Sequence, residues 1–359
     1  MHCQRLLEMD GFECVWPGLN PVGSSTQAIH DWLTHGPKRY PGVSWEIPGY
    51  NRDFMAHICA NRERHYRDGA ALRSIDDLKP AIAGKKVVIV CPGPSLLRTF
   101  ADGPLPLDDE TVVLAINHAA RAVDLTQPNH NSFIGERHAL VRWLTAPNGT
   151  LLPGIPAAPL VTMPEASAWL ADTWPVERRF YYGVDWREAP NDSRERFPYL
   201  CSVHVTPTMA LDFAVRMGAE RVVFLGMDFA LDLDRRVYFD TPAERHPNAE
   251  DFALAQAAIG VRGDVCPTTH MLQYHRNIME AMCYWVERTA RIPCLNASDG
   301  GIFDWRPMTI QEALGGKHEP IVDRRTGSLR TPEGDERVSE EGLRTKVARI
   351  LVPPALAGV

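Results

Sequence analysis

We predict an α/β fold for this chain: a Rossmann-like, largely parallel sheet with helices on both faces, preceded by an N-terminal extension. Three observations predict it. Short runs of β-branched and other apolar residues recur along the chain, polar residues follow the carboxyl end of each run, and helical segments separate several of the runs. Strands that are buried on both faces have continuous apolar sequences, and strands that alternate with helices form parallel sheets.

Several segments have the composition of buried strands. They are the run that begins at Lys85 and residues 111–117, 132–135, 158–163, 221–228 and 292–298. Helical periodicity is found from Thr208 to Met217, before Gly218, and from about His270 to Thr289. Because parallel sheets bind ligands at the carboxyl ends of their strands, the residues that follow these runs are candidates for a site.

Three parts of the chain differ in composition. Residues 1–80 are mixed and interrupted by Pro and Gly, and we interpret them as an N-terminal extension with a helix near residues 51–72. Residues 85–314 contain the alternating strands and helices, and residues 315–359 form a polar tail. Residues 175–203, which are rich in Arg and Tyr, interrupt the alternation, and we interpret them as a lid or a small insertion.

The overall composition narrows the range of partners. With 38 Lys and Arg against 45 Asp and Glu, the net charge is −7, which predicts no nucleic-acid partner. The chain has no apolar stretch long enough to span a membrane, and its acidic first residues do not form a signal peptide, so we expect a cytoplasmic protein. The 8 scattered cysteines indicate free thiols. Homo-oligomerisation is left open.

The turn Gly93-Pro94-Ser95 follows the first strand of the predicted sheet. A glycine lets backbone N–H groups approach a ligand, and a helix that begins at Ser95 directs its positive end at that ligand, which suits phosphate. The turn contains neither the dinucleotide fingerprint nor a Walker loop. A plain connection from strand to helix is therefore the alternative.

Polar residues at the ends of later strands are further candidates. Asn117 could hold a ribose or a base edge, or it could form an Asx turn. Thr206 and Thr208 open a helix, and capping accounts for one of them. The other threonine is expected to face the crevice beside Gly226 and Asp228, where Asp228 could bind a sugar hydroxyl or Mg²⁺.

Two residues lie farther along the chain. Tyr238 is in the loop after the strand of residues 221–228, and a packing role is its alternative. His270 opens the long helix, whose positive end favours the neutral imidazole that a general base requires. A structural histidine is the alternative there.

The order of these motifs resembles that of two related families. One is the bacterial sialyltransferases of glycosyltransferase family 42. The other is the archaeal 6-hydroxymethylpterin diphosphokinase-like family, which includes motility-accessory glycosyltransferase-like proteins. The resemblance covers about residues 85–314 and is carried by Gly93 to Leu96, Asn117, the threonine helix start, Gly226 to Phe229, Tyr238, His270 and Asn296. It implies a nucleotide-binding transferase domain.

The sialyltransferase resemblance implies a role for each matching residue. Gly93, Pro94 and Ser95 would line the turn at the nucleotide phosphate, and Asn117 would contact the nucleotide's sugar. Tyr238 would bind the phosphate of the leaving group, and His270 would deprotonate the acceptor hydroxyl. This sequence differs from the family pattern at Pro92, at Gly135-Glu136 and at Ala230. A carboxylate at Glu136 repels an anionic nucleotide unless a metal ion lies between them.

The diphosphokinase resemblance extends to the closing segment of residues 296–314. It implies transfer of diphosphate from ATP to a hydroxymethyl group, with Mg²⁺ held by a carboxylate such as Asp228. We favour glycosyl transfer from a nucleotide-sugar to a hydroxyl-bearing acceptor, because Tyr238 and His270 both have a role in that reaction. Diphosphate transfer and a non-catalytic nucleotide-binding module are the alternatives.

Overall fold

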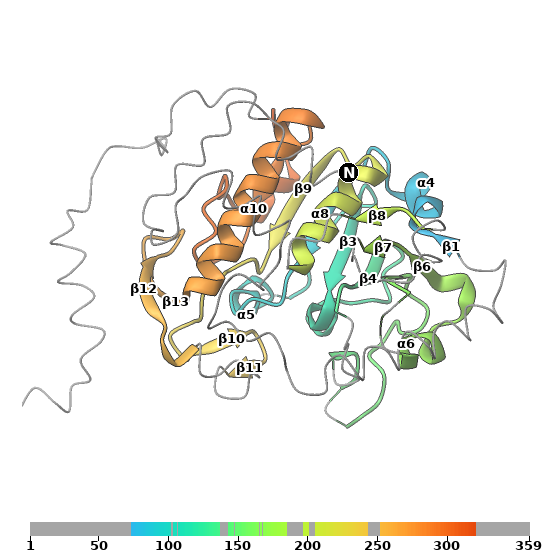
Figure 1. Cartoon of the computed structure of the whole chain (residues 1–359), viewed down its shortest axis with the longest axis horizontal. Coiled ribbons are helices and arrows are strands. Elements are labelled where there is room, and N and C mark those ends of the chain that lie inside the picture. The colour runs from blue at the N-terminus through green and yellow to red at the C-terminus, as the bar shows by residue number, and fades with distance from the viewer. Residues whose placement is uncertain are drawn as a thin grey trace, which may run out of the picture.

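The computed structural model describes residues 73–320 apart from residues 102, 106, 137–142, 147, 165, 167, 185–196, 201–204 and 243–251. These residues form an 8-stranded sheet with helices on both faces (Figure 1), which confirms the predicted α/β, Rossmann-like class. The expected helix at residues 51–72 and the tail beyond residue 320 lie outside the described residues.

The sheet has the strand order β1-β6-β5-β4-β3-β2-β9-β14, and each neighbouring pair is parallel. Every strand that the apolar runs predict is present, and β1 and β6 are additional. The strands are β1 (Arg73–Ser74), β2 (Lys86–Val90), β3 (Thr111–Ile116), β4 (His130–Ile134), β5 (Leu160–Thr162), β6 (Arg179–Tyr181), β9 (Arg221–Leu225) and β14 (Cys294–Asn296).

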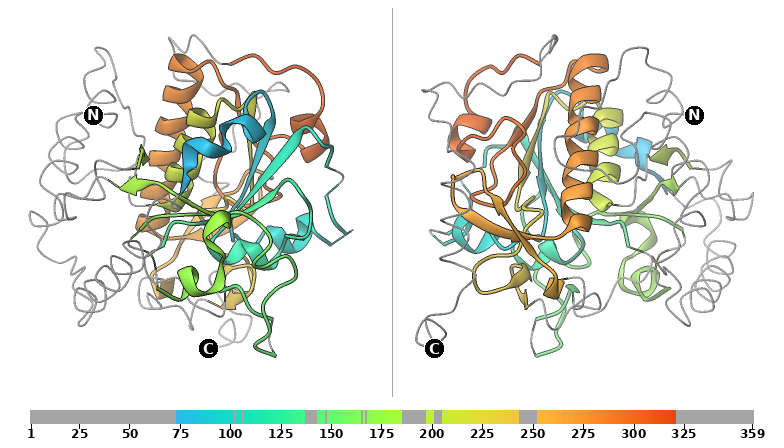
Figure 2. Two further views of the ribbon diagram at one scale, coloured as in Figure 1. Left: turned by 90° about the vertical axis from the view of Figure 1, so that its right-hand side faces the viewer. Right: turned by 60° about the vertical axis from the view of Figure 1, so that its left-hand side comes forward.

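Side chains of each central strand alternate between two apolar layers. Val87 and Ile89 of β2 belong to one buried cluster, and Val88 and Val90 belong to the other. Figure 2 shows α8 (Thr206–Met217) and α10 (His270–Thr289) side by side on one face of the sheet. The helices α5 (Leu96–Thr99) and α11 (Ile310–Leu314) contribute Leu96 and Ala313 to the cluster on the other face. Burial on both faces explains why β2, β3 and β9 are apolar after their first residue.

The direction in which the chain winds reverses between β2 and β9. From β2 the chain proceeds outward through β3, β4 and β5 to β6, and α8 then returns it to β9 on the opposite side of β2. Ligands of open α/β sheets bind at such a reversal, outside the carboxyl ends of the strands. The turn Gly93 to Ser95 follows β2, and Gly226 to Asp228 follow β9, so both lie at this point.

The segment that we interpreted as a lid or insertion contributes a strand to the main sheet. β6 pairs with both β5 and β1, and its residues Arg179, Phe180 and Tyr181 are buried. The lid interpretation is therefore wrong for this strand, because the Arg-rich and Tyr-rich composition concealed a short buried strand. Its neighbours η6 (Val176–Arg178), β7 (Gly183–Val184) and β8 (Tyr199–Leu200) continue this part of the fold, and residues 185–196 and 201–204 lie outside the described residues.

Shorter elements complete the fold. Two hairpins lie at the carboxyl end of the sheet, toward the lower left of Figure 1: β10 (Arg236–Tyr238) with β11 (Thr241–Pro242), and β12 (Gln256–Ile259) with β13 (Val265–Thr268). The remaining elements are η3 (Ile75–Leu78), α4 (Lys79–Ile82), η4 (Asn117–Arg121) and α6 (Ala168–Thr173). Within the described part of the chain, no helix has the length and apolarity needed to cross a bilayer.

Candidate functional site

The turn after β2 lies directly against the turn after β9. The backbone nitrogen of Gly93 donates a hydrogen bond of 2.9 Å to the carbonyl oxygen of Gly226. A Cβ atom on Gly93 would lie 2.3 Å from that oxygen and 2.7 Å from Cγ of Asp228. Glycine is required here because the two turns approach more closely than any side chain allows.

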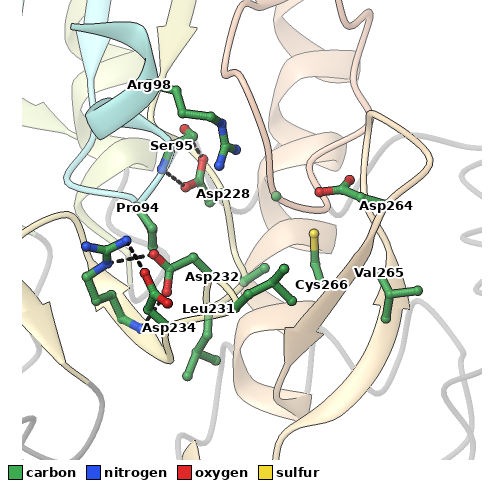
Figure 3. A pocket seen from close by; sticks show the side chains of 14 residues that line it. Pro94, Ser95, Arg98, Asp228, Leu231, Asp232, Asp234, Asp264, Val265 and Cys266 are labelled. Carbon is green, nitrogen blue, oxygen red and sulfur yellow. Dashed lines mark hydrogen bonds and ion pairs between the residues drawn. The ribbon is translucent and has the colours of Figure 1, made fainter. Parts of the chain in front are cut away.

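Asp228 binds the first turn of α5 (Figure 3). Its Oδ2 atom accepts a hydrogen bond of 2.6 Å from the backbone nitrogen of Ser95, and its Oδ1 atom accepts one of 2.5 Å from the Ser95 hydroxyl. The side chain is almost completely buried. Asp228 thus occupies the position at the start of α5 where we expected a phosphate of the ligand.

Burial is the largest influence on the ionisation of Asp228, and it raises the pKa of this carboxyl group to about 6. The hydrogen bonds from Ser95 and the positive charge of Arg98 oppose the rise. Burial, with a smaller effect of the Asp228 charge, also raises the pKa of the Cys91 thiol. Asp228 is therefore an anion at neutral pH, although one that is held at a cost in free energy.

The described hydrogen bonds of Asp228 are to Ser95, and its expected role as a Mg²⁺ ligand stays a prediction. Both of its oxygens bond to Ser95, so it is the acceptor that fixes the start of α5. Among the residues that the structure describes, no group of three or more His, Cys, Asp or Glu side chains could hold a metal ion.

Asn117 connects the ends of neighbouring elements. Its Oδ1 atom accepts a hydrogen bond of 3.1 Å from the backbone nitrogen of Gly135, and its amide nitrogen lies 3.4 Å from the Thr206 hydroxyl. Its φ of 49° is left-handed, a conformation that asparagine tolerates better than most residues. The side chain therefore joins the ends of β3 and β4 to the start of α8, instead of closing an Asx turn.

Glu136 and Thr206 lie beside Asn117. The Thr206 hydroxyl lies 3.5 Å from Oε1 of Glu136, and a Cβ atom on Gly135 would lie 2.2 Å from Cγ2 of Thr206. Asn117 and Thr206 are buried, whereas Glu136 is exposed. The three side chains, which we call the polar triad, come from distant parts of the sequence and meet at the carboxyl edge of the sheet.

The threonines at the start of α8 do not cap this helix. Its N-cap residue is Val205, and no side chain of the described residues caps it. Thr208 donates its hydroxyl to the carbonyl oxygen of Val205 at 2.7 Å, and Thr206 faces the other members of the polar triad. The expectation that capping accounts for one threonine is therefore wrong, because the helix begins two residues earlier than its apolar pattern indicates.

Tyr238 approaches the polar triad from the β10–β11 hairpin. Its ring packs edge-on against the His118 ring, with 4.4 Å between the centroids. Burial raises the pKa of the Tyr238 hydroxyl strongly, and the negative charges of Glu136 and Asp240 raise it further. The phenol is therefore neutral over the whole physiological range and can donate a hydrogen bond.

The structure adds His118, Arg121 and Asp240 to the residues around Tyr238. His118 is buried, and its Nε2 atom lies 3.7 Å from Oδ1 of Asp240. Arg121 donates a hydrogen bond to the other oxygen of Asp240. In the sequence, His118 follows Asn117 and Asp240 is two residues after Tyr238, and this proximity to predicted site residues could have indicated them. Their contact with each other depends on the tertiary structure.

His270 is the first residue of α10, as predicted. Its side chain is exposed, and its Nε2 atom lies 3.1 Å from the amide nitrogen of Gln256. The next two residues, Met271 and Leu272, pack in the same small apolar cluster as Tyr238. The start of α10 therefore lies beside the hairpin that carries Tyr238.

Asn296 does not take part in the polar triad. It is fully buried, its amide nitrogen donates to the carbonyl oxygen of Phe303, and its Oδ1 atom accepts a hydrogen bond of 3.0 Å from the backbone nitrogen of Ser298. The side chain holds the loop that follows β14. Its hydrogen bonds are thus those of a structural asparagine.

A hollow opens on the other side of the glycine turn, where Pro94 and Ser95 face the strand β13 (Figure 3). Its charged lining residues are Asp228, Asp232, Asp234, Asp264, Arg98 and Arg236. Arg236 pairs with Asp232 at 2.6 Å and with Asp234 at 2.9 Å. Four carboxylates against two arginines disfavour an anionic ligand here. Tyr238 offers a neutral hydroxyl donor beside the polar triad, so we place the candidate nucleotide site at the triad and Tyr238.

Comparisons with known proteins add one solved structure. No protein-family model matches the sequence, and no curated protein matches it. The chain is similar to the structure of a MAf glycosyltransferase from Magnetospirillum magneticum AMB-1, with a TM-score of 0.48 and 20% identity, over 75% of this chain and 40% of that chain. This chain thus spans less than half of that protein's length.

Proposed function

We propose that this protein is a nucleotide-dependent transferase that moves a sugar from a nucleotide-sugar donor to a hydroxyl acceptor. The observation that carries the proposal is the meeting of Asn117, Glu136 and Thr206 at the carboxyl ends of β3 and β4, beside Tyr238. An amide, a carboxylate and a hydroxyl in one place provide the donors and acceptors that sugar hydroxyls require.

The charges in the site favour one orientation of the donor. Glu136 is an acceptor for hydroxyl groups and repels phosphate, so it belongs beside a sugar of the donor. Tyr238 carries a neutral hydroxyl that can donate to an anion, so it belongs beside the phosphate that leaves with the nucleotide. Asn117 orients the triad through its bonds to Gly135 and Thr206.

The transfer would proceed as a displacement at the anomeric carbon. The acceptor hydroxyl gives its proton to His270, and its oxygen forms a bond to the anomeric carbon. The bond from that carbon to the phosphate oxygen breaks, and both bonding electrons leave with the nucleotide phosphate. A hydrogen bond from Tyr238 stabilises the charge that develops on that oxygen.

The contacts of Asp228 support this proposal over Mg²⁺-dependent diphosphate transfer. Metal ions neutralise the charge of the transferred group in such reactions, and carboxylates hold them. The carboxylate expected for that role, Asp228, has both oxygens bonded to Ser95. Diphosphate transfer and a silent binding module remain as outcomes that the experiment distinguishes.

A thermal-shift panel of CMP, UDP, GDP and ATP, each with and without Mg²⁺, tests the nucleotide site. A ligand at 100 times its dissociation constant stabilises the folded state by about 2.7 kcal/mol. Stabilisation by at least one nucleotide is expected, and the absence of any shift would overturn the proposal. Glu136→Gln should reduce the shift, while the matched variant Glu110→Gln, at the amino end of β3, should not.

Turnover assays then distinguish the reactions. With the nucleotide-sugar of the base that binds, His270→Ala should abolish donor consumption and leave nucleotide affinity nearly unchanged. Formation of AMP from ATP that a chelator abolishes would indicate diphosphate transfer instead. Binding without consumption of any donor would indicate the silent module.

A further inference from the structure

We infer that Arg121 and Asp240 are positioning residues for Tyr238: their ion pair holds the β10–β11 hairpin against the end of β3 and so fixes the Tyr238 hydroxyl at the donor phosphate. The inference rests on the proposed function for the identity of the ligand. The holding of Tyr238 itself is a property of the ligand-free protein.

The hairpin has little rigidity of its own. It consists of Arg236–Tyr238 and Thr241–Pro242, and the pairing register shifts between Arg236 and Tyr238. Hairpins of two strands are marginally stable in isolation. The position of Tyr238 must therefore come from contacts outside the hairpin.

The first external contact is the ion pair. Arg121, the last residue of η4, donates from Nη1 to Oδ2 of Asp240, and Oδ1 accepts a hydrogen bond of 3.0 Å from the Thr241 hydroxyl. The Asp240 side chain is 19% exposed and that of Arg121 is 28% exposed, so solvent screens the pair less than it screens a surface pair.

The second contact ties the hairpin to the glycine turn. The backbone nitrogen of Phe239 donates a hydrogen bond of 3.0 Å to the carbonyl oxygen of Pro92. The ring of His118 meets Tyr238 edge-on and stacks with Phe239 at 6.0 Å. Tyr238 thus precedes two residues that are anchored to the ends of β2 and β3, and its ring rests on His118.

The ion pair also controls the charge beside the Tyr238 hydroxyl. Glu136 and Asp240 both act on Tyr238 with negative charge, and Arg121 compensates that of Asp240. Without Arg121, a donor phosphate at Tyr238 would face the Asp240 carboxylate without its arginine partner. Loss of the pair should therefore weaken binding of the phosphate and not of the nucleoside.

Calorimetry tests this difference with Arg121→Met, Arg121→Lys and Asp240→Asn, using the nucleoside monophosphate and the nucleoside of the base that binds. Arg121→Met should lower affinity for the monophosphate by about tenfold or more and leave nucleoside affinity unchanged, since truncating one partner of a partly buried charge pair leaves the other unpaired. Arg121→Lys keeps the charge and should retain most of the affinity.

The matched control is Arg216→Met. Arg216 forms a bidentate pair with Asp76, at 2.6 and 2.8 Å, at the opposite edge of the sheet. The Arg216→Met substitution removes the same kind of ion pair and should change neither the monophosphate affinity nor the nucleoside affinity. An equal loss of monophosphate and nucleoside affinity in Arg121→Met would indicate a general structural role and overturn the inference.

A double-mutant cycle with Tyr238→Phe tests whether Arg121 acts through Tyr238. If it does, Arg121→Met should cost little further affinity once the hydroxyl is gone, because the two effects share one interaction. Full additivity would show that Arg121 acts on the phosphate independently of Tyr238, contrary to the inference.

A ligand-free measurement separates the inference from the proposed function. In protein labelled with 3-fluorotyrosine, the ¹⁹F signal that Tyr238→Phe removes is that of Tyr238. This signal should shift or broaden in Arg121→Met and Asp240→Asn and stay in place in Arg216→Met. An unchanged signal in Arg121→Met overturns the inference even if nucleotides bind, whereas a wild-type protein that binds no nucleotide overturns the proposed function.

Discussion

The carboxylate of Asp228 accepts hydrogen bonds from both the backbone nitrogen and the hydroxyl of Ser95, at 2.6 and 2.5 Å. This contact joins the turn after β2 to the turn after β9, at the point where the winding of the sheet reverses. An internal anion therefore satisfies the start of α5, and the candidate ligand site shifts one strand along the sheet, to the ends of β3 and β4.

Ser95→Ala should destabilise the protein. The substitution leaves a buried carboxylate oxygen without its hydroxyl donor, which costs about 1–3 kcal/mol. Urea unfolding at neutral pH measures the effect. Thr99→Ala is the control in the same helix, because the Thr99 hydroxyl donates to the carbonyl oxygen of Ser95 and its side chain is less buried. A loss of equal size in both variants would contradict the special role of the Ser95 contact.

The stability of the wild type should fall as pH rises from about 4 to about 6 relative to that of Asp228→Asn. Burial raises the pKa of Asp228 from 3.8 to about 6, so in this range the folded state binds more protons than the unfolded state. At 1.36 kcal/mol per pKa unit the change amounts to about 3 kcal/mol. Urea unfolding of both proteins at several pH values measures it, and parallel curves would show that Asp228 does not titrate in this way.

Gly93→Ala should be among the most destabilising single substitutions in the sheet. Its Cβ atom would lie 2.3 Å from the carbonyl oxygen of Gly226, and neither turn can retreat without breaking the Asp228 contact. Gly84→Ala is the comparison, since Gly84 has a φ of 75° but open space around it. There only backbone strain of about 1–2 kcal/mol is expected. Thermal unfolding that ranks Gly84→Ala as the worse change would refute the steric argument.

Asn117 should contribute to nucleotide binding through its amide nitrogen. Asn117→Asp keeps an acceptor for Gly135 and tolerates the left-handed φ of 49°, but it loses the donor to Thr206 and adds a charge beside Glu136. We expect a loss of nucleotide affinity of about tenfold. Asn117→Gly keeps the left-handed backbone conformation and removes both side-chain hydrogen bonds. Calorimetry on the two variants therefore separates the effect of the added charge from the effect of the lost hydrogen bonds. Wild-type affinity in Asn117→Asp would remove the polar triad from the proposed site.

The strands and long helices of the core were predictable because the pattern of apolar residues within each segment indicates how that segment is buried. β2 and β3 are continuous apolar runs, and α10 begins at His270 and ends at Thr289 as its periodicity indicates. β6 was not predictable, because Arg179 and Tyr181 are buried within it and only its pairing with β5 and β1 makes it a strand.

The sequence predicted individual residues of the candidate site, but it did not predict which of them lie together. Asn117, Thr206 and Tyr238 follow from their places at the ends of elements, and the structure brings them to one edge of the sheet. Asn296 follows from the same pattern, yet it bonds the loop after β14. A polar residue at the end of a strand can face a ligand or its own loop, and the local sequence is the same in both cases.

The sequence by itself determined the class of fold, since apolar runs and helical periods depend on which residues must be buried. It also determined which polar residues stand at the carboxyl edge of the sheet. Only the tertiary structure decided what they do there. Whether Asp228 meets a metal ion, a sugar or Ser95, and whether Arg121 meets Asp240, depends on the order of strands in the sheet, because strand order sets which segments far apart in the chain come within a few ångströms of each other.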